Sequence, residues 1–340
     1  MDALLPASDF AALRAGLANP LPAADATAAE AARARQASLT KPPGSLGILE
    51  DLAVFMAGWQ GRARPRIELA QALVFAGNHG ICARGVNPYP QAVTAQMVAN
   101  FEAGGAAINQ LCRAFDARLS VVALELDRPT ADFTAGSAMT EAEVLAAMAQ
   151  GAAAVDPKAD VLLLGEMGIG NSTIAAALAR GLFGGHASDW VGPGTGADTQ
   201  GVSLKARVIE EGIARHRPDP RDGLALLAAF GGREQAAICG AVLAARQARI
   251  PVILDGFICT AAAAVLHPLG GALDHCLAGH CSAEPGHRRL LDALGLRPVL
   301  ALDMRLGEGS GAAVALGVLR AALIAHDGMA TFDEAGVSGG

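Results

Sequence analysis

Five short apolar runs recur along the chain, and Ala-rich segments with helical character separate them. The runs cover residues 70–76, 119–124, 161–164, 251–254 and 298–302. Each ends near a segment that contains Gly or Asp, and none shows a regular alternation of apolar and polar positions. Such runs are typical of strands that are buried on both faces of a parallel sheet. The pattern therefore predicts an α/β fold in which helices flank a parallel, Rossmann-like sheet.

The pattern before the first run is helical rather than extended. Residues 8–38 are rich in Ala with dispersed Arg, Asp and Glu, which is the composition of surface helices with small contact faces. Pro42 and Pro43 then interrupt the helical pattern, because proline removes a backbone donor and cannot continue a helix. A further helix is predicted over residues 48–60.

Composition and charge limit the kinds of ligand. The chain is 52% hydrophobic but only 4% aromatic, so the core must consist mainly of Ala, Val, Leu and Ile. A net charge of −7 provides no electrostatic footprint for nucleic acid. An anionic ligand must instead be held locally, by backbone N–H groups and a few cations. We therefore expect small-molecule ligands and no nucleic acid.

The cysteines and the apolar segments bear on localisation. Six cysteines are scattered along the chain without a paired framework, which indicates reduced thiols of a cytoplasmic protein. The N-terminal residues lack the basic and apolar regions of a secretory signal. No stretch combines about 18 uncharged apolar residues with interfacial anchors, so we expect no membrane span.

The strand ends indicate where the chemistry lies. In an open parallel sheet, ligands bind beyond the carboxyl ends of the strands. The segments that follow the runs and carry polar groups are residues 78–79, 166–171, 255 and 307–311. We expect them to converge at one edge of the sheet.

The segment MRLGEGSGAA, residues 304–313, is the strongest candidate for catalysis. Glu308 lies between Gly307 and Gly309, which leave its carboxylate accessible and let a ligand approach the backbone closely. An acidic residue here can instead cap the helix predicted to begin near Ser310. The segment alone leaves both roles open, and the other converging strand ends favour catalysis.

Two Gly-rich segments are candidates for binding a phosphate or a ribose. The first, residues 164–173, has the spacing G-x-x-G-x-G, which is not the dinucleotide fingerprint G-x-G-x-x-G. Its Asn171, Ser172 and Thr173 open a helix, where they can hold a phosphate or simply cap the helix. A carboxylate at Glu166 would repel a phosphate, so we expect it to meet a hydroxyl or a cationic ring.

The second segment is VGPGTGAD, residues 191–198, which can wrap a phosphate with backbone donors or form a plain surface loop. Lys205 follows as a candidate countercharge, with a solvated helix face as the alternative. Asp255 ends an apolar run, where a carboxylate contacts a substrate or caps a helix, and we favour the contact.

The histidines do not predict a metal site. His275, His280 and Cys281 lie close together in sequence, with His287 nearby, but their spacing matches neither C-x-x-C nor H-E-x-x-H. His79, within GNHG, can serve as a general base or as a hydrogen-bonded structural residue.

Seven segments, in order, resemble the nicotinate-nucleotide–dimethylbenzimidazole phosphoribosyltransferase family, which assembles the lower nucleotide loop of cobalamin. The resemblance runs from about residue 39 to 325, and KPPGSLG and MRLGEGSGAA are its most specific motifs. The segments are residues 41–47, 77–80, 93–94, 165–168, 255–257, 282–284 and 304–313.

The resemblance implies both an architecture and a reaction. It implies a homodimer, with a large α/β domain over residues 71–305 and a small helical domain from residues 1–70 and 306–340. The phosphoribosyl group of nicotinate mononucleotide would pass to a benzimidazole-type base without a cofactor. Glu308 would be the base, and Glu166 a second catalytic group. Substrate would be bound by Gly168, Asn171, Ser172, Thr173, Gly192, Gly194, Thr195, Lys205, Asp255, Ser282 and Leu306.

The implied pocket for the attacking base draws on residues 89–90 and 93–97. Here the chain has Tyr89 and Met97, where family members have Ser and Gln, so the physiological base stays open. A Rossmann-like oxidoreductase is disfavoured because no G-x-G-x-x-G follows a strand. A non-enzymatic nucleotide-binding regulatory module would explain the Gly-rich loops but not a Gly-flanked glutamate among converging strand ends.

Overall fold

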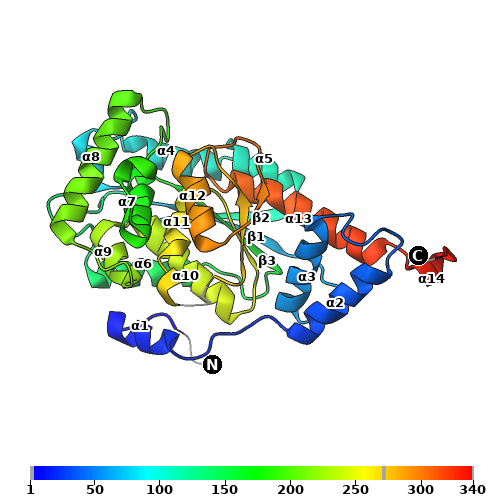
Figure 1. The fold of residues 1–340 in the computed structure, drawn as a ribbon. Coiled ribbons are helices and arrows are strands. Elements are labelled where there is room, and N and C mark those ends of the chain that lie inside the picture. The colour runs from blue at the N-terminus through cyan, green and yellow to red at the C-terminus, as the bar shows by residue number, and fades with distance from the viewer. Residues whose placement is uncertain (1–3, 270–272, 339–340) are drawn as a thin grey trace.

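A computed structural model describes residues 4–269 and 273–338. These residues form a six-stranded parallel sheet in the order β2-β1-β3-β4-β5-β6. The strands are β1 (Ala70–Ala76), β2 (Ala117–Ala123), β3 (Val161–Met167), β4 (Val252–Leu254), β5 (Cys276–His280) and β6 (Pro298–Leu300). Figure 1 shows helices on both faces of this sheet. The predicted α/β class and parallel sheet are confirmed.

The helices form two layers, because alternate residues of each central strand point to opposite faces. Leu73 and Phe75 of β1 belong to one core, and Ala72 and Val74 belong to the other. The first core also contains residues of α1 (Phe10–Leu17), α6 (Glu141–Ala153), α7 (Asn171–Phe183), α8 (Thr199–His216), α9 (Gly223–Phe230), α10 (Arg233–Gln247), α11 (Phe257–Ala264) and α12 (Pro285–Leu294). The second contains residues of α3 (Ile48–Gln60), α4 (Ala92–Glu102), α5 (Ala107–Ala114) and α13 (Ser310–Gly328). The remaining helices are α2 (Ala26–Ser38), α14 (Phe332–Ala335), η1 (Gly80–Arg84), η2 (Ala187–Asp189) and η3 (His267–Leu269).

Two strands differ from the prediction in ways that affect the site. β3 continues through Met167, so Gly165 and Glu166 lie within the strand, opposite Val74 and Phe75 of β1. β5 occupies residues of the segment considered for metal binding, and the apolar pattern does not predict it. The reason is physical: Gly279 and His280 are unusual in a strand, and β5 is stable here because it pairs with β4 and β6.

The strand order creates a crevice at the carboxyl end of the sheet. β1 lies between β2 and β3, so the chain leaves β1 toward one side and later returns to the other. In doubly wound sheets, ligands bind at such a switch point, where successive loops diverge. Here the loops that follow β1 and β3 begin at Gly77 and Gly168, and a Cβ on Gly168 would lie only 2.7 Å from the Gly77 carbonyl.

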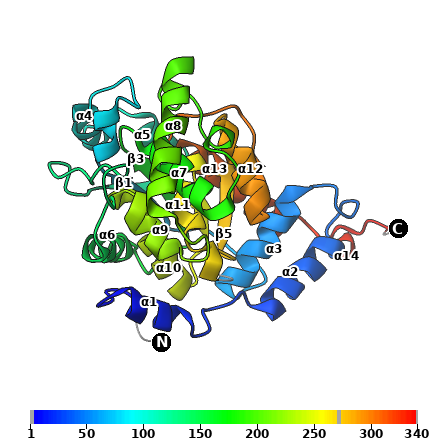
Figure 2. The same ribbon diagram turned by 60° about the vertical axis from the view of Figure 1, so that its left-hand side comes forward.

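Helices from both chain ends lie together at one end of the molecule. Both views show α2, α3 and α14 there (Figures 1 and 2), and Figure 1 shows α13 extending toward them from the sheet. An antiparallel bridge joins Leu39 to Thr331, and the Arg35 guanidinium donates to the carbonyls of His326 and Met329. α13 packs against β5 as well as α3. The division into a domain of residues 71–305 and a second domain from the chain ends stays a prediction.

α13 is the described helix that is long and apolar enough to cross a membrane. Half of its apolar window is buried inside the protein, where Ala312, Leu316 and Leu319 belong to the second core. A core helix meets the same criteria of length and composition, and α13 packs as one.

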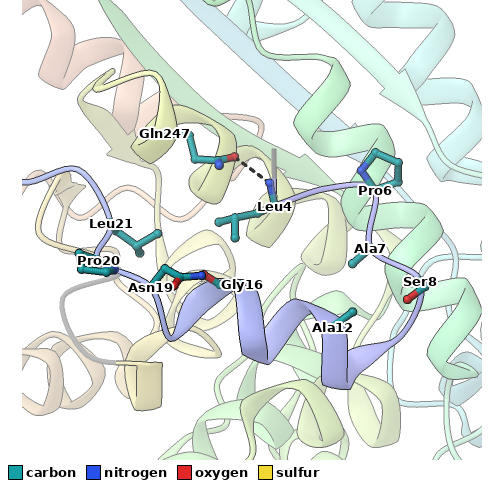
Figure 3. A pocket seen from close by; sticks show the side chains of 10 residues that line it. All are labelled: Leu4, Pro6, Ala7, Ser8, Ala12, Gly16, Asn19, Pro20, Leu21 and Gln247. Carbon is teal, nitrogen blue, oxygen red and sulfur yellow. Dashed lines mark hydrogen bonds between the residues drawn. The ribbon is translucent and has the colours of Figure 1, made fainter. Parts of the chain in front are cut away.

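A cavity of about 530 Å³ lies far from the strand ends that carry the polar segments. It lies between the N-terminal arm and the end of α10, where the Leu4 amide donates to Gln247 (Figure 3). Because α10 leads into the start of β4, this cavity is at the amino end of the sheet. None of the residues predicted to bind substrate lines it.

We predict that Gly240→Ala lowers the free energy of unfolding by roughly 3 kcal/mol, the upper range for overpacking a core. α10 crosses α6 so closely that a Cβ on Gly240 would lie 1.9 Å from the Met148 carbonyl. Urea denaturation measures the effect. Gly328→Ala is the control, because nothing lies within 4 Å of its Cβ; equal stability of the two variants would contradict the prediction.

Candidate active site

Three buried carboxyl groups converge at the carboxyl end of the sheet. They belong to Glu166 in β3, Asp255 after β4 and Glu308 before α13, and only 5%, 1% and 6% of these residues are exposed. We call these three residues the acidic cluster. The predicted convergence of strand ends thus brings together three side chains that are far apart in sequence.

Hydrogen bonds to the backbone fix the loop that carries Glu308. Asp255 accepts the N–H groups of Gly309 at 3.1 Å and of Ala312 at 3.0 Å. Asp255 therefore caps α13, a helix remote in sequence. Of the two roles considered for Asp255, substrate contact and helix capping, the contacts in the structure are those of a cap. The amide of Glu308 donates to the carbonyl of Glu166 at 3.3 Å, which ties the loop to β3 as well.

Gly165 makes this arrangement sterically possible. A Cβ at residue 165 would lie 2.5 Å from the nitrogen of Gly309, which is closer than real Cβ contacts. Gly307, Glu308 and Gly309 all have positive φ, and φ is 64° at Glu308. Left-handed backbone is costly for a residue with a side chain, and such strain is concentrated at functional sites.

The carboxylate of Glu308 does not cap the helix that follows it. The N-cap of α13 is Gly309, which has no side-chain bond, and the Oε2 atom of Glu308 is buried without a hydrogen-bond partner among the described residues. Burial raises the pKa of Glu308, and the backbone N–H of Ile108 partly opposes this effect. Glu308 is therefore a more basic carboxylate than an exposed glutamate, and one of its oxygens makes no hydrogen bond among the described residues.

The pKa values of the other two members of the cluster are also raised. Burial, followed by the negative charges of Asp255 and Glu234, raises the pKa of Glu166 to about 8. The side-chain amide of Asn171 donates to Glu166 and opposes that rise. Burial raises the pKa of Asp255 to about 7, against the effect of its backbone donors. The cluster holds protons near neutral pH, and a cationic ligand would favour their release.

A second group of residues lies beside the acidic cluster. The buried Lys205 donates from Nζ to the Ser172 hydroxyl and to the Gly192 carbonyl, each at 3.1 Å. Gly194 has a φ of 54°, and a Cβ there would lie 2.9 Å from Nζ. We call Ser172, Gly192, Gly194 and Lys205 the lysine cradle. Because Ser172 follows Asn171 on the first turn of α7, the cradle adjoins the acidic cluster.

Lys205 is therefore not a solvated lysine on a helix face. Burial lowers its pKa, and the charge of Glu284 opposes that effect. Neither Asn171 nor Ser172 caps α7, because Gly170 occupies the N-cap position. Helix capping by Asn171 or Ser172 and solvent exposure of Lys205 were the alternatives to ligand binding, and the structure shows neither.

The other predicted residues lie around these two groups. Thr173 and Ser282 are buried, and Ser282 is hydrogen-bonded to His287. The side chains of Tyr89, Thr195 and Leu306 are exposed, whereas Met97 on α4 is half-buried. The Thr94 hydroxyl accepts the amide of Ile169, so the segment around Met97 lies beside the β3–α7 loop.

The histidines have partners within the protein. His79 Nε2 lies 2.7 Å from Oε1 of Glu234, and both side chains are fully buried beneath Gly168. His275 is hydrogen-bonded to the Val242 carbonyl, and His287 contacts Thr260. Across the described ranges, no three His, Cys, Asp or Glu side chains group as metal ligands.

Two acidic residues that contact the site are not predicted by the sequence motifs. Glu234 is the second residue of α10 and lies against Gly77, Gly168 and Gly232. Its signal in the sequence is an acidic residue two positions after the pair Gly231-Gly232. Glu284 contacts the Gly192–Gly194 segment, and its signal is a carboxylate that directly follows the strand-end segment Ser282-Ala283.

The fold and the site together define a class: an α/β protein with ligand-binding groups at the carboxyl ends of parallel strands. The family model described as "Phosphoribosyltransferase" (DBI_PRT) matches residues 21–337. The chain belongs to this phosphoribosyltransferase family.

Relatives agree with this assignment. Proteins of Rhodobacter capsulatus and Ruegeria pomeroyi, both named nicotinate-nucleotide–dimethylbenzimidazole phosphoribosyltransferase, are 61% and 60% identical to the chain. The alignments cover 95% and 99% of this chain and 96% and 100% of those proteins. The crystal structure of CobT from Thermus thermophilus matches with a TM-score of 0.86 at 43% identity, over 92% of this chain and all of that one.

We predict that the free energy of unfolding falls as the pH rises from about 5 to 8. The folded-state pKa values of Glu166 and Asp255 are raised to about 8 and 7, from ordinary values of 4.5 and 3.8. Their protonated forms therefore stabilise the folded state fully at low pH, and this stabilisation is lost as the pH rises through the raised values.

Glu166→Gln should remove part of this slope and be more stable than the native protein at pH 8. Each pKa unit corresponds to on the order of 1 kcal/mol. Chemical denaturation at several pH values measures the slope. Glu68→Gln, at an exposed position before β1, is the control. Parallel pH profiles for Glu166→Gln and the native protein would contradict the prediction.

Proposed function

We propose that the chain transfers the phosphoribosyl group of nicotinate mononucleotide to 5,6-dimethylbenzimidazole or a related base. The products are α-ribazole 5′-phosphate and nicotinate, and the reaction serves cobalamin biosynthesis. The observation that carries the proposal is Glu308, held in strained backbone within an acidic cluster that adjoins a buried lysine. The names of the relatives support the same substrates.

The reaction requires a base more than an acid. A ring nitrogen of the incoming base attacks the anomeric carbon of the ribose, and the bond to nicotinate breaks with inversion. The electron pair of that bond returns to a pyridinium ring that was cationic, so the leaving group needs no proton. The other nitrogen of the attacking base must lose its proton, or the product would carry a positive charge.

Glu308 is the group that accepts this proton. Its buried Oε2 has no partner within the described residues, and burial increases its basicity. General base catalysis of this kind contributes roughly 10²–10⁴ to the rate. Holding the attacking and leaving rings on opposite sides of one carbon lowers the remaining barrier.

Glu166 serves as the second catalytic group. A cationic pyridinium ring or a ribose that develops positive charge favours the ionised form of Glu166 and is stabilised by it in turn. Asp255 also positions Glu308, because its oxygens accept the N–H groups of Gly309 and Ala312.

The lysine cradle and the first turn of α7 bind the mononucleotide phosphate. Lys205 supplies the positive charge, and the helix N-terminus supplies backbone donors. The residues assigned to the mononucleotide are Gly168, Asn171, Ser172, Thr173, Gly192, Gly194, Thr195, Lys205, Asp255 and Ser282. Tyr89, Met97 and Leu306 are assigned to the pocket for the attacking base.

The proposal includes a cytoplasmic homodimer that works without a cofactor. All six cysteines are free thiols, as expected in a reducing compartment. Leu302 and Leu306, in the loop before α13, are 54% and 58% exposed, and Ile324, near the end of α13, is 73% exposed, so apolar surface is left at both places. A second copy of the chain that packs on this surface would remove it from water.

We predict that Glu308→Gln lowers turnover by a factor of roughly 10²–10⁴ while both substrates still bind, because the amide cannot accept the proton. Nicotinate release from nicotinate mononucleotide and dimethylbenzimidazole measures turnover, and calorimetry measures binding. Parallel assays with adenine and a phenolic base identify the preferred acceptor. Glu68→Gln is the control and should retain full activity. Near-normal turnover of Glu308→Gln would remove Glu308 from the role of base.

We predict that sedimentation velocity gives twice the mass of the chain, and that Ile324→Asp shifts the protein toward monomer. A charge on this exposed apolar position is costly to bury in an interface. Ser203→Asp is the control, because Ser203 is exposed on α8 at the other end of the molecule (Figure 1). A native protein that sediments as a monomer would contradict the proposed dimer.

A further inference from the structure

A carboxylate lies against the glycine segment of the lysine cradle. Oε1 of Glu284 accepts the N–H of Gly194 at 2.9 Å, and only 7% of Glu284 is exposed. Its Oε2 is buried without a hydrogen-bond partner among the described residues, and a Cβ on Gly192 would lie 2.3 Å from this atom. The fold does not require this arrangement, because α12 begins at Pro285 with no side-chain cap from Glu284.

The N–H of Gly194 and the nearby Lys205 are among the groups expected to hold the mononucleotide phosphate. We propose that Glu284 is the resident anion beside the ligand-free cradle, and that the phosphate replaces its negative charge as Glu284 gains a proton and stays in place. This inference rests on the proposed function, which places the phosphate at Lys205. It makes Glu284 a positioning residue that holds the loop ready for an anion.

The charges that face Glu284 support an exchange. Lys205 on α8 and Arg305 in the loop before Glu308 are the positive groups that affect it, and the Gly194 N–H is its donor. Arg305 itself donates to the Gly194 carbonyl at 3.0 Å. A phosphate at the Gly194 N–H would lie against the Glu284 carboxylate, and two adjacent buried anions repel each other strongly. Either the phosphate or the carboxylate must therefore lose its charge at this place.

Because Glu284 is enclosed by its neighbours, protonation of its carboxylate is favoured over movement of the side chain into solvent. The side chain is boxed in by the Gly192–Gly194 segment and by Pro285, which a Cβ on Gly192 would also approach, to 2.6 Å. Burial already raises the pKa of Glu284 despite the nearby Lys205. An incoming dianion raises it further, so the neutral acid becomes the bound form.

The test uses inorganic sulfate, because sulfate remains a dianion near neutral pH and cannot take up the proton itself. Isothermal titration calorimetry at pH 8, in two buffers with different ionisation enthalpies, measures the affinity and the number of protons taken up. The native protein should bind sulfate with uptake of about one proton. Glu284→Gln should bind it roughly tenfold more tightly and without proton uptake, since one like-charge contact is gone.

Glu284→Asp is the matched control, because it keeps the charge and should show no gain in affinity. Equal or weaker sulfate binding by Glu284→Gln overturns the proposal. Sulfate binding by the native protein without proton uptake overturns it too, and this measurement stands even where a variant fails to fold.

Two further measurements separate this inference from the proposed function. If the native protein releases no nicotinate, the proposed reaction is wrong, whereas the sulfate titrations still decide the role of Glu284. If Lys205→Met binds sulfate as tightly as the native protein, the cradle is not the anion site, and both the phosphate assignment and the resident-anion proposal fail.

Discussion

The hydrogen bonds that Asp255 accepts from Gly309 and Ala312 determine the geometry on which the rest of the site depends. They join the end of β4 to the start of α13, and Gly165 lets the connecting loop lie directly against β3. The loop is thereby held through its own backbone N–H groups, and the side chain of Glu308 is not needed to hold it. That carboxylate is consequently fixed in place while one of its oxygens is left without a partner among the described residues.

The burial of three carboxyl groups in one place is unfavourable for the free protein, because the charged forms are desolvated and repel one another. Their raised pKa values express this cost. Under the proposed function, a phosphoribosyl donor with a cationic ring would reverse it by bringing positive charge beside Glu166. At the lysine cradle the central charge is positive, because Lys205 is buried there. The acidic cluster thus matches the cationic ring of a pyridinium mononucleotide, and the lysine cradle matches its phosphate.

Much of this arrangement could be predicted from the sequence, and the missing parts share a physical cause. The apolar pattern predicts the bounds of β1 and α3, and the strand-end rule brings Glu166, Asp255 and Glu308 to one edge. β5 is missed because pairing with its neighbours, rather than its own composition, stabilises it. The capping of α13 by Asp255 and the burial of His79 against Glu234 depend on tertiary packing, which no local pattern encodes.

The crystal structure of Glu308→Gln with nicotinate mononucleotide and dimethylbenzimidazole tests the central claim most directly. The account predicts that the phosphate lies between Ser172 and the Gly192–Gly194 segment, next to Lys205. It also predicts that a nitrogen of the base lies within hydrogen-bond distance of residue 308, on the opposite side of the anomeric carbon from the nicotinate ring. A phosphate bound elsewhere, or a base whose nitrogens face away from residue 308, would contradict it.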